Sequence, residues 1–237
     1  MKGIVTFLLS FLISWGSYGQ LVTIGKKEFG YFYFGPKVGL TLSKISNTSN
    51  SLGGSSVFRT GFELGVSGKL GINEKWALQP ELMFVKKGVT VESGIFESNY
   101  KTSYIGIPIL VQYSLMSIGV TRIHLEGGGV VNVRTSGTAE LNSAAVGQSY
   151  EVNLDNSSWR SMDYGVVIGA GAEWPRKLGI WVFELHYDYG FMDVYKDDSE
   201  FNANRTVGFS LIYLYDFIDF YKRLSGNLKS KGGKIAP

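Results

Sequence analysis

Two histidines, each followed two positions later by a carboxylate, are the residues of this sequence whose types and spacing could support catalysis. They are His124 with Glu126 and His186 with Asp188. Residues two apart lie on the same face of a β-strand, so each pair could combine a general base with an orienting carboxylate. A hydrolase or acyltransferase is one hypothesis, and an interior polar network is the other. The sequence favours the network, because the two histidines fall at different heights along their predicted strands.

Other reactive groups are missing from the sequence. It contains no cysteine, which excludes disulfides, thiol catalysis, thiolate metal sites and a lipid anchor on cysteine. It has no nucleophile elbow, phosphate-binding loop or histidine cluster with metal-ligand spacing. The formal net charge is only +3, with acidic and basic residues interspersed, which disfavours nucleic-acid binding. We therefore predict no catalytic residue, no cofactor and no metal site.

The first 19 residues have the features of a secretory signal peptide. Lys2 precedes an apolar stretch over residues 4–15, and the small-x-small sequence of residues 17–19 precedes Gln20. About a dozen apolar residues fall short of the roughly 20 that a membrane-spanning helix needs. The sequence thus predicts a cleaved leader over 1–19 and an exported protein.

The rest of the chain repeats an alternation of apolar and polar residues with period two, which is typical of β-strands. In the first such segment, for example, Val38 and Leu40 alternate with Lys37, Gly39 and Thr41. The eight segments cover residues 32–43, 58–72, 76–87, 105–115, 123–134, 162–174, 181–190 and 206–217. This pattern predicts an all-β fold, an eight-stranded antiparallel barrel over residues 31–217.

The connections between the predicted strands alternate in length. The short ones are 73–75, 116–121 and 175–179, and the long ones are 44–57, 88–99, 135–160 and 192–203. Outer-membrane barrels combine short periplasmic turns with long extracellular loops in this way. An even number of strands then leaves both ends of the chain in the periplasm, including an N-terminal segment over 20–30.

A soluble barrel with its apolar face inward is the alternative, and side-chain volume argues against it. An eight-stranded barrel has an interior just wide enough for side chains to fill, yet the apolar face includes Trp76, Trp174 and Trp181. The opposite face combines glycines with charged residues that could pair across a narrow lumen. The apolar face is therefore expected to point outward into lipid, with aromatic residues near the strand ends forming girdles at the membrane interfaces.

Several of these strands resemble the PorT-like outer-membrane β-barrel family. The similar segments are GPKVGLTLS at 35–43, LQPELMF at 78–84, YIGIPILVQY at 104–113 and the last strand at 204–215. Gly106 departs from the pattern, since a glutamate is common there. The resemblance implies an outer-membrane barrel, and the founding type of the family acts in a protein-secretion pathway of gliding and periodontal bacteria.

The resemblance and the location together imply a function and a set of partners. We expect a non-enzymatic envelope or protein-secretion accessory, with a small outer-membrane enzyme as the alternative. The expected partners are outer-membrane lipid and lipopolysaccharide, the barrel-assembly machinery during biogenesis, and a secretion or periplasmic partner.

The basic tail over 218–237 extends beyond the last predicted strand. Apolar residues recur there at three- and four-residue steps, while basic residues fall elsewhere on the helical wheel: Phe217, Phe220, Tyr221, Leu224 and Leu228 against Lys222, Arg223 and Lys229. This period predicts an amphipathic helix of about two to three turns that begins near Asp216 and lies on the periplasmic membrane interface. A frayed tail without a role is the alternative.

Overall fold

The computed structural model describes residues 31–46, 55–93, 96–143, 148–154, 159–177, 179–196 and 201–216. The predicted signal peptide (1–19), N-terminal segment (20–30) and C-terminal tail (218–237) lie outside the described residues. Within the described part of the chain, no helix is long and apolar enough to cross a membrane.

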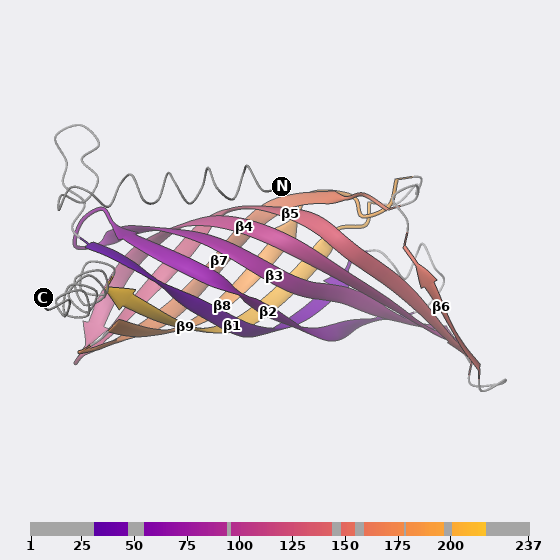
Figure 1. The fold of residues 1–237 in the computed structure, drawn as a ribbon, viewed down its shortest axis with the longest axis horizontal. Coiled ribbons are helices and arrows are strands. Elements are labelled where there is room, and N and C mark those ends of the chain that lie inside the picture. Colours follow the sequence, from indigo (N-terminus) through magenta and orange to yellow (C-terminus); the bar gives the residue numbers. More distant parts are fainter. Residues whose placement is uncertain are drawn as a thin grey trace, which may run out of the picture.

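Eight long antiparallel strands form a closed barrel, as the alternation predicted. Strand β4 pairs with β3 on one side and with β5 on the other, which closes the order β4-β3-β2-β1-β9-β8-β7-β5 into a ring (Figure 1). A ninth, short strand, β6, pairs with the end of β5. The strands are β1 (Tyr31–Ile45), β2 (Ser55–Gly71), β3 (Trp76–Ser93), β4 (Phe96–Ile118), β5 (Thr121–Ser143), β6 (Gln148–Asn153), β7 (Met162–Arg176), β8 (Gly179–Gly190) and β9 (Asn204–Asp216).

Tight turns join the strands at the end where β1 begins and β9 ends. Between β2 and β3, the Asn73 Oδ1 atom accepts hydrogen bonds from the backbone amides of Lys75 and Trp76, both at 2.9 Å. Between β4 and β5, Gly119 has a φ of 60°, a left-handed conformation that suits glycine and permits a two-residue turn. The predicted short connections are therefore present at this end.

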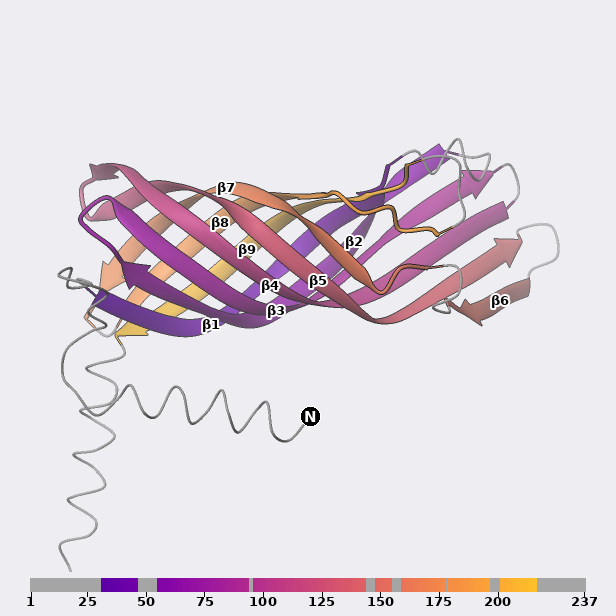
Figure 2. The ribbon, with the colours of Figure 1, turned by 90° about the horizontal axis from the view of Figure 1, so that it is seen from above.

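The structure differs from the sequence prediction at two of the long connections. β3 continues to Ser93 and β4 already starts at Phe96, so most of the predicted loop at 88–99 is a hairpin. Likewise, β5 continues to Ser143 and pairs with β6 inside the predicted loop at 135–160. Figure 2 shows these strands continuing beyond the rest of the barrel. Along β3 the faces are exchanged beyond residue 87, where Val89 and Val91 are buried and Thr90 and Glu92 are more exposed, so the outward apolar face that identified the strand ends there while the backbone pairing continues.

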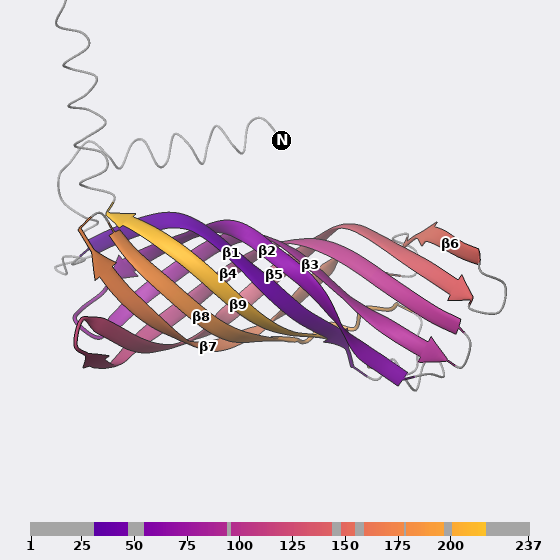
Figure 3. The same ribbon diagram turned by 90° about the horizontal axis from the view of Figure 1, so that it is seen from below.

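Side chains alternate between the outside of the barrel and its interior. On β8, Trp181, Phe183 and Leu185 are 42%, 56% and 47% exposed, whereas Glu184 and His186 are buried. Neighbouring strands repeat this pattern around the wall, where β1, β9, β8 and β7 lie side by side (Figure 3). The predicted inward and outward faces of the strands are thus confirmed.

Aromatic rings gather on the outside of the barrel near the tight turns. The rings of Trp76 and Tyr113 lie 4.7 Å apart between their centroids, and those of Trp181 and Tyr213 lie 4.5 Å apart. These strand-end positions agree with the girdle expected at one membrane interface.

A closed barrel predicts heat-modifiable migration in a detergent gel. Closure leaves no free strand edge in the ring, so the folded protein should resist unfolding by dodecyl sulfate at room temperature. The unheated sample is expected to run faster than the boiled sample, because the compact barrel binds less detergent. Equal migration of a refolded sample before and after boiling would contradict a closed barrel.

Candidate functional site

The interior of the barrel encloses a dense set of titratable side chains, including both histidines. Seven carboxylates, three lysine amines and both histidines are buried there: Glu63, Glu81, Glu126, Asp163, Glu173, Glu184, Asp188, Lys37, Lys69, Lys87, His124 and His186. The strand alternation places them all on the inward face. Because water is scarce in a filled lumen, these groups must satisfy one another.

Lys37 on β1 lies at the centre of this network. Its Nζ atom donates to both carboxylate oxygens of Glu81 on β3, each at 3.0 Å, and to Oε2 of Glu184 on β8 at 2.8 Å. One ammonium group therefore bridges two carboxylates that come from opposite sides of β1. The side chains involved are at most 3% exposed, so the ion pairs are screened little by solvent.

Two glutamines extend the network toward β4 and β5. Gln79 donates from Nε2 to Glu81 Oε1 at 2.7 Å and to Glu184 Oε1 at 2.9 Å. Gln112 donates from Nε2 to Gln79 Oε1 at 2.6 Å and to Glu126 Oε2 at 3.3 Å. The two amides thus connect carboxylates from three strands into one hydrogen-bonded layer.

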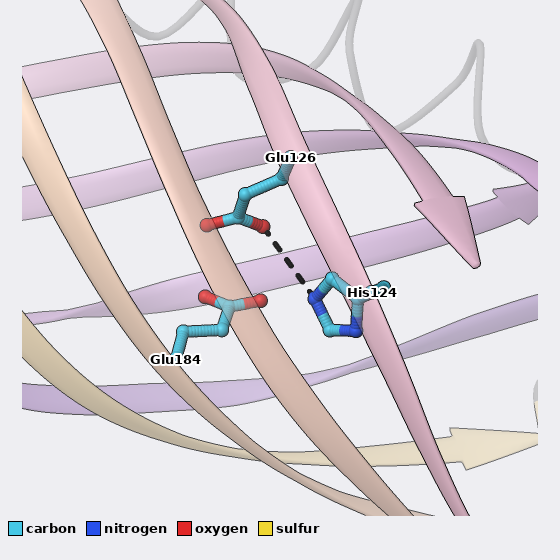
Figure 4. Close-up of side chains that lie close together, drawn as sticks. All are labelled: His124, Glu126 and Glu184. Carbon is cyan, nitrogen blue, oxygen red and sulfur yellow. Dashed lines mark ion pairs between the residues drawn. The ribbon is translucent and has the colours of Figure 1, made fainter. Parts of the chain in front are cut away.

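His124 sits beside this layer, with each ring nitrogen near a carboxylate. Its Nε2 atom lies 3.8 Å from Glu126 Oε2, and its Nδ1 atom lies 3.2 Å from Glu173 Oε1, which also accepts from Lys69. Glu184 approaches the same region from β8, as Figure 4 shows. The predicted partnership of His124 and Glu126 is therefore present in the structure.

His186 belongs to a different part of the lumen. Its Nε2 atom lies 3.4 Å from Glu63 Oε2, and the other Glu63 oxygen accepts from the Ser210 hydroxyl. Asp188, the carboxylate that the sequence placed with His186, accepts a hydrogen bond from Lys87 instead. The two histidines consequently act in separate pairs and do not build one catalytic site.

Glycines on the facing strands make room for both imidazole rings. A Cβ atom at Gly171 would lie 2.4 Å from Cε1 of His124, and a Cβ atom at Gly208 would lie 2.2 Å from Nε2 of His186. These separations are far inside van der Waals contact. The glycines of the lumen face are therefore what allows bulky polar groups to fit inside an eight-stranded barrel.

Apolar side chains pack inside the barrel on either side of the polar layers. Near the tight turns, one cluster consists of Ile180, Val182, Ile212 and Leu214 with Tyr33. Toward the opposite end, a second consists of Ile45, Val89, Val91, Trp159 and Val194. The cavity between them has a volume of about 40 Å³ and is lined in part by Lys37, Glu63 and His186. Since a water molecule needs about 10–15 Å³ of such space, the cavity has room for only a few waters, which disfavours a pore.

The sequence itself identifies what kind of barrel this is. Residues 20–196 match the family described as "Outer membrane protein beta-barrel domain". The chain belongs to this family. The exposed apolar band of this outer-membrane barrel therefore faces lipid, and its polar residues fill the lumen, as the volume argument predicted. A search of curated protein sequences finds no significant match.

Several solved structures are similar to this chain at low sequence identity. Ail, the attachment invasion locus protein of Yersinia pestis, is 14% identical with a TM-score of 0.38 and covers 79% of this chain and 99% of its own. Neisserial surface protein A is 13% identical with a TM-score of 0.46, and the match covers 78% of this chain and 97% of the neisserial chain. OprG from Pseudomonas aeruginosa is 14% identical with a TM-score of 0.44, and the match covers 80% of this chain and 95% of the OprG chain.

The sequence predicted the correct face for the lumen residues of this outer-membrane barrel but did not predict which of them contact one another. Lys37, Glu81 and Glu184 were all predicted to point inward, and alternation was the signal. Their mutual contacts join strands that are far apart in the chain, and period-two patterning carries no information about such contacts. The convergence of Glu184 with His124 and Glu126 was missed for the same reason.

Proposed function

We propose that this outer-membrane barrel is non-enzymatic and serves envelope assembly or protein secretion by binding a partner outside the lipid. The PorT-like resemblance supports the secretion role. The observation that carries the proposal is a contrast between two regions: the reactive side chains are enclosed in the lumen, whereas β5 and β6 carry apolar side chains beyond it.

The β5–β6 surface, defined here as Leu141, Tyr150 and Val152, is the best candidate for partner binding. These side chains are 44%, 62% and 54% exposed. Leu141 is directly opposite Tyr150, and Val152 is opposite Ala139, two residues before Leu141, so all three share one face. Among the described residues, β6 is paired along one edge only. A strand that pairs with one neighbouring strand only, beside exposed apolar residues, favours recognition by strand addition.

The test is complementation of a deletion strain with a surface variant. Leu141→Thr, Tyr150→Thr and Val152→Thr together remove the apolar surface and retain residues that favour strands. We expect this variant to lose complementation of protein export or envelope integrity at a normal amount of folded barrel. His186→Gln, which alters the lumen, should complement as well as the wild type.

The opposite pattern would contradict the proposal. If the surface variant complements fully and His186→Gln does not, the function depends on the lumen, as the enzyme alternative requires. Gel migration of unheated outer membranes measures the folded amount of each variant, so a loss of function can be separated from a loss of protein.

A further inference from the structure

The lumen group formed by His124, Glu126 and Glu184 has the composition of a metal site. Each residue offers one ligand atom, and these atoms lie within 4.8 Å of one another (Figure 4). His124 and Glu126 come from β5 and Glu184 from β8, and the intervening β7 brings them together, because Gly171 lies opposite both His124 and Glu184. From these observations and those below, we propose that the group binds one divalent transition-metal ion, for which Zn²⁺ is the best match.

The orientation of the His124 ring favours a metal at Nε2. Nδ1 lies 3.2 Å from Glu173 Oε1 without forming a hydrogen bond to it. Nε2 faces Glu126 at 3.8 Å and lies 3.2 Å from the Gln112 amide nitrogen, which donates to Nε2 when Nε2 is unprotonated. In zinc-bound histidines a carboxylate commonly lies beside the ring nitrogen that does not bind the metal, as Glu173 does here.

The composition of the surrounding layer agrees with a cation site. Three carboxyl groups, Glu81, Glu126 and Glu184, lie in it, and Lys37 is the one lysine that pairs with them among the described contacts. The other buried acids that form ion pairs have cations of their own, such as Lys69 for Glu173 and Lys87 for Asp188. A buried excess of negative charge is unfavourable unless protons or a cation compensate it.

An unsatisfied oxygen completes the argument. Glu126 Oε1 is buried and has no hydrogen-bond partner among the described residues. Its side chain is 0% exposed, so no bulk water reaches it. Zinc–ligand distances of about 2.0–2.2 Å in tetrahedral geometry place ligand atoms about 3.3–3.6 Å apart, so the cluster, whose ligand atoms lie within 4.8 Å of one another, would contract by roughly 1.2–1.5 Å at its widest separation when the ion binds. Imidazole with two carboxylates is a ligand set that Zn²⁺ accepts in proteins.

The experiment measures metal retained by the folded barrel. The full mature chain without an affinity tag is refolded in detergent with one equivalent of Zn²⁺ or Co²⁺, because the filled lumen should admit the ion during folding. Chelator and gel filtration then remove loosely held metal. We expect about one Zn²⁺ per folded chain by elemental mass spectrometry, and visible absorption from bound Co²⁺.

Matched variants identify the ligands. Glu126→Gln and Glu184→Gln preserve side-chain shape, and each should lower metal affinity by at least about tenfold. His186→Gln removes the other buried histidine and should retain the metal. Gel migration confirms that each variant is folded, and Zn²⁺ should raise the urea midpoint of the wild type but not that of Glu126→Gln.

Two outcomes would overturn the proposal. One is a folded wild-type barrel that retains no metal, which would mean that protons neutralise the layer. The other is equal retention by the wild type and Glu126→Gln, which would place the metal elsewhere on the protein. Neither outcome bears on the partner-binding role of the β5–β6 surface, which complementation tests separately.

Discussion

Replacing Lys37 with methionine is expected to lower the free energy of unfolding by about 3–5 kcal/mol, because it leaves buried carboxylates without their shared cation. Inside the lumen, the Nζ atom of Lys37 lies 3.0 Å from Oε1 of Glu81 and 2.8 Å from Oε2 of Glu184. Methionine is similar in length to lysine and fills the same space, so the change reports mainly on the charge. Urea titration of the barrel in lipid vesicles, with chelator present and tryptophan fluorescence as the signal, measures the effect.

A lysine in a more exposed ion pair provides the control. Lys101 pairs with Glu140 where the two side chains are 38% and 30% exposed. Lys101→Met should therefore lower stability by no more than about 1 kcal/mol. Adding Glu184→Gln to Lys37→Met should restore part of the lost stability, since it removes one of the unpaired charges. Losses of equal size for Lys37→Met and Lys101→Met would contradict the central role of Lys37.

Placing arginine at Leu185 is expected to lower the free energy of unfolding by about 2–4 kcal/mol, because the guanidinium would enter the lipid core. Leu185 lies near the middle of β8, is 47% exposed, and is opposite Ala170 on β7 and Phe209 on β9. All of that exposed surface should contact lipid. The same urea titration in vesicles measures the change.

The matched control adds the same charge where water is expected. Val152 on β6 is 54% exposed, similar to Leu185, but lies on the part of the sheet that extends beyond the barrel. Val152→Arg should change stability by no more than about 1 kcal/mol, as found for arginine outside the lipid core. If both arginine variants destabilise the barrel equally, exposure on β8 does not correspond to lipid contact.

The inward and outward faces of the strands could be predicted from the sequence because alternation is a local property. On β8, Trp181, Phe183 and Leu185 alternate with Glu184 and His186, and the structure places the first set outside and the second inside. The volume of bulky side chains then determined which face was outward, since an eight-stranded lumen cannot contain them.

The true lengths of β3, β4 and β5 could not be predicted in this way. Beyond residue 87, β3 continues through Thr90 and Glu92, where polar residues face outward and apolar residues such as Val89 and Val91 point inward. The apolar and polar faces are therefore exchanged along the same strand. Only the continued pairing with β4, down to Ser93 opposite Phe96, identifies the segment as a strand.

The residue order alone was enough to specify an outer-membrane barrel, the number of its membrane-crossing strands and the face of each side chain within the eight predicted segments, because a period of two needs only neighbouring residues. It did not specify which interior groups meet. Lys37 and Glu184 are 147 residues apart in the chain, and Glu184 joins His124 and Glu126 from another strand. Such contacts depend on how the closed sheet staggers its strands around the lumen, and that register is a property of the whole barrel. For this reason the contacts within the polar network, and the metal site inferred from them, could be recognised only in the tertiary structure.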